Sequence, residues 1–458
     1  MYSDVNAVLT SGGKGSRNWP INLLAQGMYY PKGLMRVMGI PIAEIQVEEL
    51  KAAGITNFHF LTVGTPNKNP LADRFRDGSG YNVHIDYATT LEGIQDRGSG
   101  DGLLRFIENR CPLGHSIVLA NDNLYEVDWQ RAIEFHNRNK AVITVLVTRT
   151  KPRETIGTYG LLETNGNDRV AGIIEKPKTE TELMRALGVK TVEELNRIED
   201  VPVNTGGYIV NNGALAKLAK EGWVKKGREY ASVTKGVYFD IAGDLIKGCI
   251  EHGIPVYGFT IDNWGDLGTN TNYLSSVQRA LAGQFPSVLR ILRERGYIRL
   301  EENVWVQPET WKREDNGKRL EQLVEEGAVT LGPNTFIARR VAIEPGAHIE
   351  YSAIEKDCHV RDAEIFHSIL IPHGLVGNGA YIERSILGLG VVVAYPKKGE
   401  RDSNEQPGTR IVRSFLGPDL FVPASYNIRG STIFPGVDLE GHLQNHGPDI
   451  LDQRLGNF

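Results

Sequence analysis

Cysteine is scarce in this sequence: Cys111, Cys249 and Cys358 lie far apart and form no Cys-x-x-Cys pair. An odd, scattered set excludes a disulfide framework and a structural zinc site, and it predicts buried free thiols. Long apolar runs are also missing, because no stretch approaches the roughly 18 residues that a membrane-spanning helix needs. The first residues, Met1 to Asp4, show no charged-then-apolar signal pattern. We therefore expect a cytoplasmic protein with no membrane partner.

Neither sign of charge dominates. The 51 Lys and Arg residues against 56 Asp and Glu give a net charge of −5. A surface that binds a nucleic acid duplex normally carries a basic excess, so nucleic acid is not expected as a partner. With 458 residues, 41% of them hydrophobic, the chain is long enough for two domains with separate cores.

Short β-branched runs alternate with amphipathic stretches from residue 5 to about residue 280. The pattern predicts strands at 6–10, 58–63, 116–120 and 141–148, and helices at 42–53, 102–109 and 129–139. Strands and helices in alternation indicate an α/β layer fold, in which ligands bind beyond the carboxyl ends of the strands.

The period changes in the last third of the chain, where one aliphatic residue recurs every five or six positions. These residues are Leu331, Ile337, Ile343, Ile349, Ile354, Val360, Ile365, Ile371, Val376 and Ile382. Such a repeat is typical of a parallel β-helix. The sequence thus predicts an α/β domain over 1–280, a helical connector over 281–326 and a β-helix over 327–458. The β-helix has an inserted loop near 396–410 and a tail or cap from residue 444.

A glycine-rich segment follows the first predicted strand. Ser11, Gly12, Gly13 and Gly15 lead to Arg17, and Pro31 and Lys32 come later. Backbone N–H groups at such a strand end can bind phosphate oxygens, and the two cations can neutralise their charge. The segment is neither a Walker loop nor a dinucleotide fingerprint, and glycines serve tight turns as well.

Two acidic residues are candidate metal ligands. Asp122 ends an apolar strand, and Asp266 is expected in a tight turn flanked by glycines. Carboxylates that face a phosphate loop can bind Mg²⁺, a cation that prefers oxygen ligands. A turn cap is the alternative role for Asp122.

The first 280 residues resemble the sugar-1-phosphate nucleotidylyltransferases, also called NDP-sugar pyrophosphorylases. The family's Gly-Gly-x-Gly-Thr/Ser-Arg is similar to residues 12–17, and its Pro-Lys to Pro31-Lys32. Residues 98–102 are similar to the Gly-Thr-Ala-Asp-Ala of the ADP-glucose branch. The other blocks, in the family's order, are 121–122, 159–160, 175–177, 204–208 and 264–269.

The resemblance implies a Rossmann-like, GT-A-like nucleotidyltransferase domain followed by a left-handed β-helix. Because stacked coils offer flat lateral faces, we expect the β-helix to mediate homo-oligomer formation or to bind a regulator. It implies that a sugar-1-phosphate oxygen attacks the α-phosphorus of a nucleoside triphosphate (NTP) and that pyrophosphate leaves. The residues that it assigns fall into four groups. Arg17, Lys32 and Asp122 are catalytic. Ser11, Gly12, Gly13, Gly15, Gln95, Gly98, Ser99 and Asp101 bind the nucleotide. Gly160, Glu175, Lys176 and Asn204 bind the sugar phosphate. Asp122 and Asp266 hold Mg²⁺.

The chain also departs from the family pattern. Asn121 replaces the glycine before the strand-end aspartate, Asn18-Trp19 follows Arg17 in place of an aliphatic residue, and the stretch between Pro20 and Lys32 is longer than usual. A catalytically silent regulatory subunit is therefore an alternative. A further alternative is a bifunctional enzyme whose β-helix transfers an acyl group with His359, His367 or His373 as base. The nucleotide base and the sugar stay open.

Overall fold

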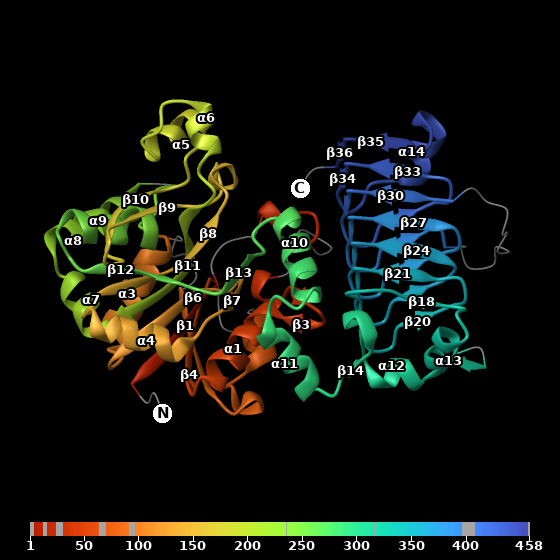
Figure 1. Cartoon of the computed structure of the whole chain (residues 1–458), viewed down its shortest axis with the longest axis horizontal. Coiled ribbons are helices and arrows are strands. Elements are labelled where there is room, and N and C mark those ends of the chain that lie inside the picture. Colours follow the sequence, from red (N-terminus) through yellow and green to blue (C-terminus); the bar gives the residue numbers. More distant parts are fainter. Residues whose placement is uncertain are drawn as a thin grey trace. The chain divides into compact units, whose positions relative to one another are not determined.

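The computed structural model describes residues 4–11, 16–23, 31–63, 70–90, 97–234, 236–315, 317–395 and 408–456. The chain divides into two compact units (Figure 1). Unit 1 comprises residues 1–13 and 46–264, and unit 2 comprises residues 14–45 and 265–458. The domain limits predicted at residues 280 and 326 stay predictions.

Unit 1 is built on one mixed sheet, whose main strand order is β10-β9-β11-β6-β1-β4-β5, with β8 on β11 and β12 on β8. Strands β6, β1, β4 and β5 are parallel neighbours, whereas β11 runs antiparallel to β6 and β8. The bounds are β1 Val5–Ser11, β4 Asn57–Val63, β5 His84–Thr90, β6 His115–Ala120, β8 Ile143–Thr150, β9 Leu161–Thr164, β10 Val170–Ile174, β11 Val201–Asn211 and β12 Val256–Thr260. The short strand β7 Asn123–Glu126 also belongs to this unit, and the unit boundary at residue 264 falls within β13 Asn263–Asp266.

The seven segments predicted in this unit, four strands and three helices, all form, with bounds shifted by at most a few residues. The helices are α1 Ile42–Ala52, α2 Pro70–Phe75, α3 Ser99–Arg110, α4 Trp129–Arg138, α7 Asn212–Leu218, α8 Gly222–Val233 and α9 Lys247–Glu251. A π-helical turn, Ile241–Ile246, runs directly into α9. Its Leu245 packs with Leu103, Val118 and Leu215 in the core between helices and sheet. The α/β layer expectation is therefore confirmed for this unit.

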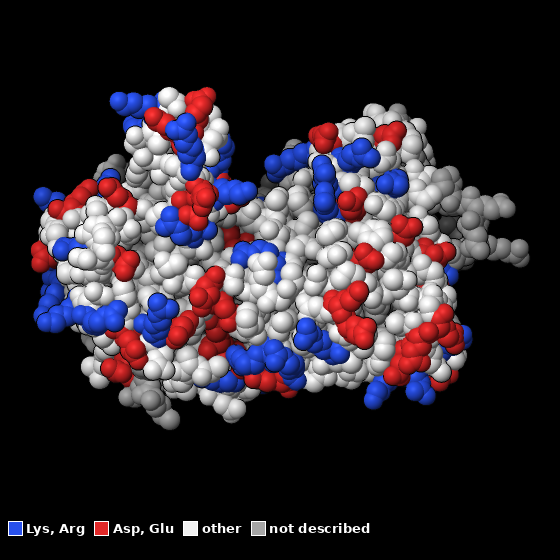
Figure 2. Space-filling view, viewed as in Figure 1, with Lys and Arg blue, Asp and Glu red and all other residues white. Residues whose placement is uncertain are grey.

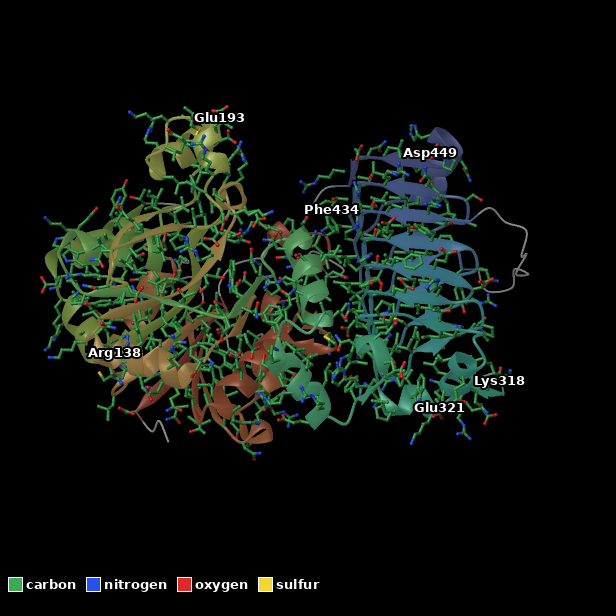
Figure 3. All side chains as sticks on the ribbon, in the orientation of Figure 1. Arg138, Glu193, Lys318, Glu321, Phe434 and Asp449 are labelled. Carbon is green, nitrogen blue, oxygen red and sulfur yellow. The ribbon has the colours of Figure 1, made fainter. Side chains whose placement is uncertain are left out.

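The pair α5 Glu180–Ala186 and α6 Val192–Asn196 forms an excursion that the sequence analysis did not predict. It has a small core of its own, in which Leu183 and Leu195 meet Leu161, Val201 and Val203. Thr191 and Glu194 form a capping box at the start of α6. Figure 3 labels Glu193 at the outer end of this excursion.

Unit 2 contains three sheets of very short strands that recur in turn along the chain. The first is β14 Ile298–Arg299, β15 Trp305–Val306, β19 Phe336–Ile337, β22 Ala353–Ile354, β25 Ile369–Leu370, β28 Ile386–Leu387, β31 Phe415–Leu416, β34 Thr432–Ile433 and β36 Arg454–Leu455. The second is β18 Thr330–Leu331, β21 His348–Glu350, β24 Ala363–Phe366, β27 Ala380–Glu383, β30 Arg410–Val412, β33 Asn427–Arg429 and β35 Asp449–Leu451. The third is β20 Ala342–Ile343, β23 His359–Val360, β26 Leu375–Val376, β29 Val392–Val393 and β32 Phe421–Val422. Apart from the antiparallel pair β14/β15, successive strands in each sheet pair in parallel, as Ile349 does with Ile365.

A column of buried serines lies directly before successive strands of the first of these sheets. The backbone N–H of Ser414 donates to Oγ of Ser385 at 3.1 Å, and that hydroxyl donates to the carbonyl of Glu383 at 2.8 Å. The same two bonds recur along the column of Ser352, Ser368, Ser385, Ser414 and Ser431. A buried polar group requires such partners, so the column connects the successive strands of this sheet.

One detail of the predicted repeat is wrong. Leu370 is the buried residue at 1% exposure, and Ile371, the residue predicted, is partly exposed, because β25 ends at Leu370. The predicted tail or cap from residue 444 contains strands β35 and β36, which extend two of the sheets in register with Ile428 and Ile433.

The predicted helical connector is more broken than expected. It contains α11 Pro286–Glu294, α12 Pro308–Lys312 and α13 Leu320–Glu325, and the antiparallel pairs β14/β15 and β16 Glu314–Asp315/β17 Lys318–Arg319 lie between them. Unit 2 also holds α10 Asn270–Leu281, α14 Leu439–His446, β2 Arg36–Val37 and β3 Ile40–Pro41.

Acidic and basic side chains intermingle over the face shown in Figure 2, as the small net charge suggests. Among the described residues, no helix has the length and apolar character that a membrane crossing requires. Cys249 and Cys358 are buried free thiols as predicted, whereas Cys111 is exposed.

Candidate active site

The first group of predicted site residues lies at the carboxyl ends of β1 and β6 in unit 1. These strands are parallel neighbours, with Thr10 paired to Ala120, so Ser11 and Asn121 follow at the same sheet edge. The Asn121 side-chain N–H donates to the Ser11 hydroxyl. Asp122 lies in the turn between β6 and β7, where Asn123 Nδ2 is 3.4 Å from its Oδ1. The fold therefore brings Ser11 and Asp122 to the edge where α/β sheets bind ligands.

The second group consists of the predicted sugar-phosphate residues, which three strands of unit 1 bring together. Gly160 precedes β9 and Glu175 follows β10, and the antiparallel pairing of Ile174 with Leu161 sets the two residues opposite each other. A Cβ on Gly160 would lie 2.8 Å from Glu175 Oε2. The Asn204 backbone N–H, on β11, donates to the Gly160 carbonyl at 2.9 Å.

Hydrogen bonds and an ion pair within the protein hold the polar groups of these side chains. Asn204 Oδ1 accepts from the Gly206 N–H at 2.9 Å, and its Nδ2 donates to the Tyr208 hydroxyl at 3.0 Å. An amide has two N–H donors, so one can hold Tyr208 while the other binds a ligand. Lys176 Nζ lies 3.0 Å from Glu175 Oε1, and both side chains are partly exposed. An exposed ion pair stabilises the fold little, so both groups can turn to a charged or hydroxylated ligand at small cost.

Aromatic residues back this group. Burial raises the pKa of Tyr208 well above its ordinary value, so its hydroxyl stays protonated at neutral pH. Tyr159, next to Gly160, meets Trp264 edge to face with ring centroids 5.0 Å apart. Trp264 is 8% exposed and therefore belongs to the buried core of the unit.

The predicted nucleotide residues from Gly98 to Asp101 are packed tightly against a neighbouring segment. Gly98 has φ +98, and a Cβ there would lie 2.6 Å from the carbonyl of Phe239. The Ser99 hydroxyl accepts from the N–H of Ile241 at 3.1 Å. Asp101 is 3% exposed and accepts from Arg105 at 2.6 Å and from Arg228 at 2.7 Å. These contacts give Gly98, Ser99 and Asp101 structural roles, and their nucleotide roles stay predictions.

In unit 2 the predicted catalytic Arg17 and the predicted metal ligand Asp266 both lie near Gly268. Asp266 closes strand β13 and does not lie in a turn as expected, but its Oδ1 accepts from the Gly268 N–H at 2.7 Å and thereby shapes the turn that follows. A Cβ on Gly268 would lie 3.3 Å from Arg17 Nη2 and 2.8 Å from Asp266 Oδ1. The guanidinium and the carboxylate therefore flank the same glycine.

A pair of asparagines holds this arrangement, and sequence reasoning missed it. The buried Asn18 donates to the Leu267 carbonyl at 2.8 Å, and Asn270 donates to the Trp19 carbonyl at 3.0 Å. Asn18, which departs from the family pattern, therefore connects the segment that contains Arg17 to the segment that contains Asp266. The position of Asn18 directly after the predicted catalytic Arg17 is the sequence signal for this role.

The other predicted residues divide between those described and those not. Lys32 opens a short 3-10 turn, Lys32–Leu34, in unit 2. Gly12, Gly13, Gly15 and Gln95 lie outside the described residues. Within the described part of the chain, no cluster of three or more His, Cys, Asp or Glu side chains could hold a metal. Asp122 and Asp266 offer the oxygen ligands that suit Mg²⁺, although both oxygens of Asp266 also accept bonds within unit 2, from Gly268 and Asn272.

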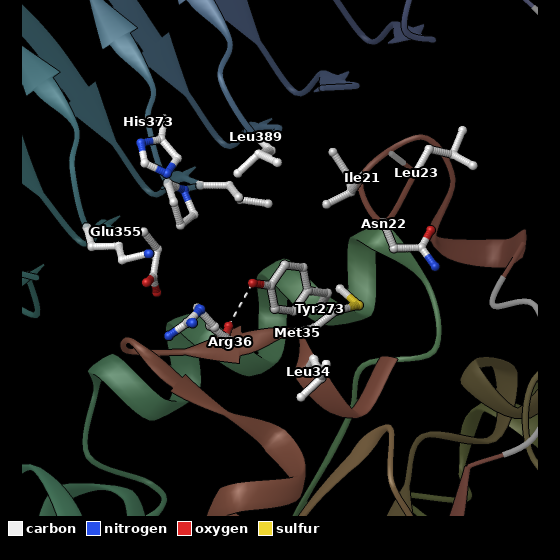
Figure 4. A pocket seen from close by; sticks show the side chains of 13 residues that line it. Ile21, Asn22, Leu23, Leu34, Met35, Arg36, Tyr273, Glu355, His373 and Leu389 are labelled. Atoms are coloured by element: carbon white, nitrogen blue, oxygen red, sulfur yellow. Dashed lines mark hydrogen bonds between the residues drawn. The ribbon is translucent and has the colours of Figure 1, made fainter. Parts of the chain in front are cut away.

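A separate cavity of about 230 Å³ lies within unit 2 (Figure 4). Apolar side chains such as Leu34, Met35 and Leu389 form most of its wall. Glu355 reaches it at 2% exposure, its Oε1 accepting from the Gly39 N–H at 2.8 Å. Burial raises the pKa of this carboxyl above its ordinary value, against the opposing charge of Arg36. These lining residues were not among the predicted site residues.

The three histidines considered for acyl transfer are placed as follows. His359 lies between Glu344 and Tyr395, at 2.8 Å and 2.9 Å from its two ring nitrogens. His367 stacks on Tyr351, and His373 lines the cavity.

Comparison with known proteins decides the family. The nucleotidyl transferase family model matches residues 6–282. The chain belongs to the nucleotidyl transferase family. This nucleotidyl transferase is 24% identical over 387 residues to the UTP–glucose-1-phosphate uridylyltransferase of Synechocystis sp., covering 79% of this chain and 87% of the relative.

The names of two further relatives refer to mannose 1-phosphate. The mannose-1-phosphate guanylyltransferase of Mycobacterium tuberculosis is 25% identical, with 76% of this chain and 79% of the relative covered. The probable mannose-1-phosphate guanyltransferase of Schizosaccharomyces pombe is 23% identical, with 83% and 86% covered. The predicted nearness to the ADP-glucose branch stays a prediction.

Proposed function

We propose that this protein transfers a nucleotidyl group from an NTP to a sugar 1-phosphate. An oxygen of the sugar phosphate forms a bond to the α-phosphorus, the bond from that phosphorus to the bridging oxygen of the β-phosphate breaks, and pyrophosphate leaves. Membership of the family and the names of its relatives support this reaction. Such a displacement depends on positioning and on neutralising charge, which the side chains described above can supply.

The observation that carries the proposal is the convergence of Gly160, Glu175 and Asn204. A carboxylate, an amide and a glycine that leaves room beside them form a set suited to sugar hydroxyls, and Lys176 adds a cation for the sugar's phosphate. The glycine is essential to the set, because any side chain at position 160 would collide with the Glu175 carboxylate.

The nucleotide side supports the same reaction. We propose that Arg17 and Lys32 neutralise the triphosphate and that Asp122 and Asp266 bind Mg²⁺, which when bound would neutralise phosphate charge in the transition state. Arg17 lies against the turn of Asp266, and Asp122 lies at the carboxyl edge of the sheet.

We further propose that the three sheets of unit 2 form a left-handed β-helix. The parallel pairing one coil apart, as between Phe336 and Ala353 and between Ala353 and Ile369, supports a helical path. The flat faces of such a stack suit self-association, and a homo-oligomer is therefore part of the proposal.

The test is pyrophosphate release with Mg²⁺, using ATP, UTP, dTTP, GTP and CTP against glucose 1-phosphate, mannose 1-phosphate and other sugar phosphates. Release with one pair, lost in Asp122→Ala, is expected. Nucleotide binding without release over the whole panel would contradict the proposal and favour the silent regulatory subunit. Omission of Mg²⁺, and its replacement by Ca²⁺, tests the metal separately.

A further inference from the structure

Asn121 stands where the resembling family has glycine, and the structure gives its side chain a partner. Its Nδ2 donates to the hydroxyl of Ser11, the last residue of β1. Its backbone N–H donates to the carbonyl of Thr10 at 3.1 Å. Because Asn121 is 5% exposed, its amide is fixed by packing as well as by these bonds. The ends of two neighbouring parallel strands are thereby joined.

This contact sets the direction in which the Ser11 hydroxyl can donate. A serine hydroxyl has one proton and two acceptor lone pairs. Since the N–H of Asn121 occupies one lone pair, the Ser11 proton is directed away from the amide. Ser11 is partly exposed at the strand end, so that proton can point toward a ligand.

We propose that Asn121 is a positioning residue that holds the Ser11 hydroxyl as a hydrogen-bond donor to an oxygen of the nucleoside triphosphate. This inference rests on the proposed function. It gives Asn121, which stands where the family has glycine, a role in binding the nucleotide. A bond made equally in the ground state and the transition state changes the KM for the NTP and leaves kcat nearly unaltered.

The experiment measures NTP binding by calorimetry, with Mg²⁺ and without sugar phosphate, for the full chain. The variants are Asn121→Ala, Ser11→Ala, the double variant and Ser11→Thr. Asn212→Ala is the matched control: Asn212 is a 1% exposed asparagine whose Nδ2 donates to the Leu113 carbonyl at 2.9 Å, at the opposite, amino end of β6. Thermal unfolding of each variant shows whether it is folded.

Each single alanine variant should bind NTP about three- to tenfold more weakly, the effect of one hydrogen bond. The double variant should bind no more weakly than Ser11→Ala, because the two residues act as one unit. Ser11→Thr, which keeps a hydroxyl at position 11, should bind NTP more tightly than Ser11→Ala, and Asn212→Ala should bind as the wild type does. Steady-state kinetics of the single variants should show the same factor in KM with kcat within about twofold.

Unchanged affinity in Asn121→Ala, additive losses in the double variant, or an equal loss in Asn212→Ala would each overturn the proposal. The outcome is separable from that of the proposed function. A wild-type protein that binds NTP but releases no pyrophosphate refutes the transfer reaction and still allows this test, whereas one that binds no NTP overturns both.

Discussion

Replacement of Gly160 by alanine should impair the sugar site without unfolding the protein. The added Cβ would lie 2.8 Å from Glu175 Oε2, so the carboxylate must move. The carboxylate can move because the Glu175 side chain is flexible and 35% exposed. The φ of Gly160 is not in the left-handed region, so alanine adds no backbone strain. We expect a change in unfolding free energy of at most about 1 kcal/mol.

The kinetic effect should be larger. A hydrogen bond from a sugar hydroxyl to a carboxylate contributes about 1.5–3 kcal/mol, so its loss should lower kcat/KM for the sugar phosphate roughly 10- to 150-fold. Gly160→Ala with Glu175→Ala should be no worse than Glu175→Ala alone. The control is Gly172→Ala in the same hairpin, where a Cβ would meet the Glu163 side chain at 3.0 Å outside the predicted site. Full activity in Gly160→Ala, or an equal loss in Gly172→Ala, would refute this reasoning.

Three further perturbations test other parts of the structure. Ser385→Ala leaves the buried N–H of Ser414 without its acceptor and should lower the urea unfolding free energy by about 2–3 kcal/mol; a loss below about 0.5 kcal/mol would show that the serine column contributes little. Burial raises the pKa of Glu355 in the folded protein above the ordinary value of 4.5. The contribution of this carboxyl group to the free energy of unfolding is therefore fully present below pH 4.5 and is lost as the pH rises through the raised pKa. Glu355→Gln should therefore be more stable relative to wild type at pH 7.5 than at pH 4, by urea titration at both, and the opposite trend would contradict the burial argument. Asp122→Asn should lower kcat on the order of a thousandfold with the fold intact by circular dichroism, and near-normal kcat would remove Asp122 from the metal site.

The sequence predicts the layered part of the fold well because its signals are local. Each predicted strand of unit 1 is a β-branched run, and such runs form strands wherever a sheet can bury them. Val8 and Val118 are examples, at 0% and 1% exposure. The excursion of α5 and α6 escaped prediction because its core is formed only when Leu183 and Leu195 meet residues of distant strands.

The repeat of short strands in unit 2 shows the same limit at finer scale. Its aliphatic period indicates the recurring strands, but at Leu370 and Ile371 two neighbouring residues are both aliphatic, and only the pairing of Leu370 with Ile354 and Leu387 decides which one is buried. The serine column was missed because a single serine per coil resembles an ordinary turn residue. Its recurrence before an aliphatic pair, as in Ser368 and Ser385, is the signal that identifies it.

The candidate site was predictable as a set of residue types and not as a set of contacts. Glu175 and Asn204 lie near each other because an antiparallel hairpin packs beside β11, which no local pattern reveals. Asn18 and Asn121 looked like departures from a family pattern. Their hydrogen bonds to Leu267 and Ser11 show that each one links two segments of the site.

The most direct measurement follows the α-phosphorus. The protein is incubated with Mg²⁺, a sugar 1-phosphate and an NTP labelled at the α-phosphate or, in a parallel reaction, at the γ-phosphate, and the products are separated. We predict that the α-label appears in a nucleoside diphosphate sugar and the γ-label in pyrophosphate. Retention of the α-label in the NTP with every pair, despite nucleotide binding, would contradict the transferase account.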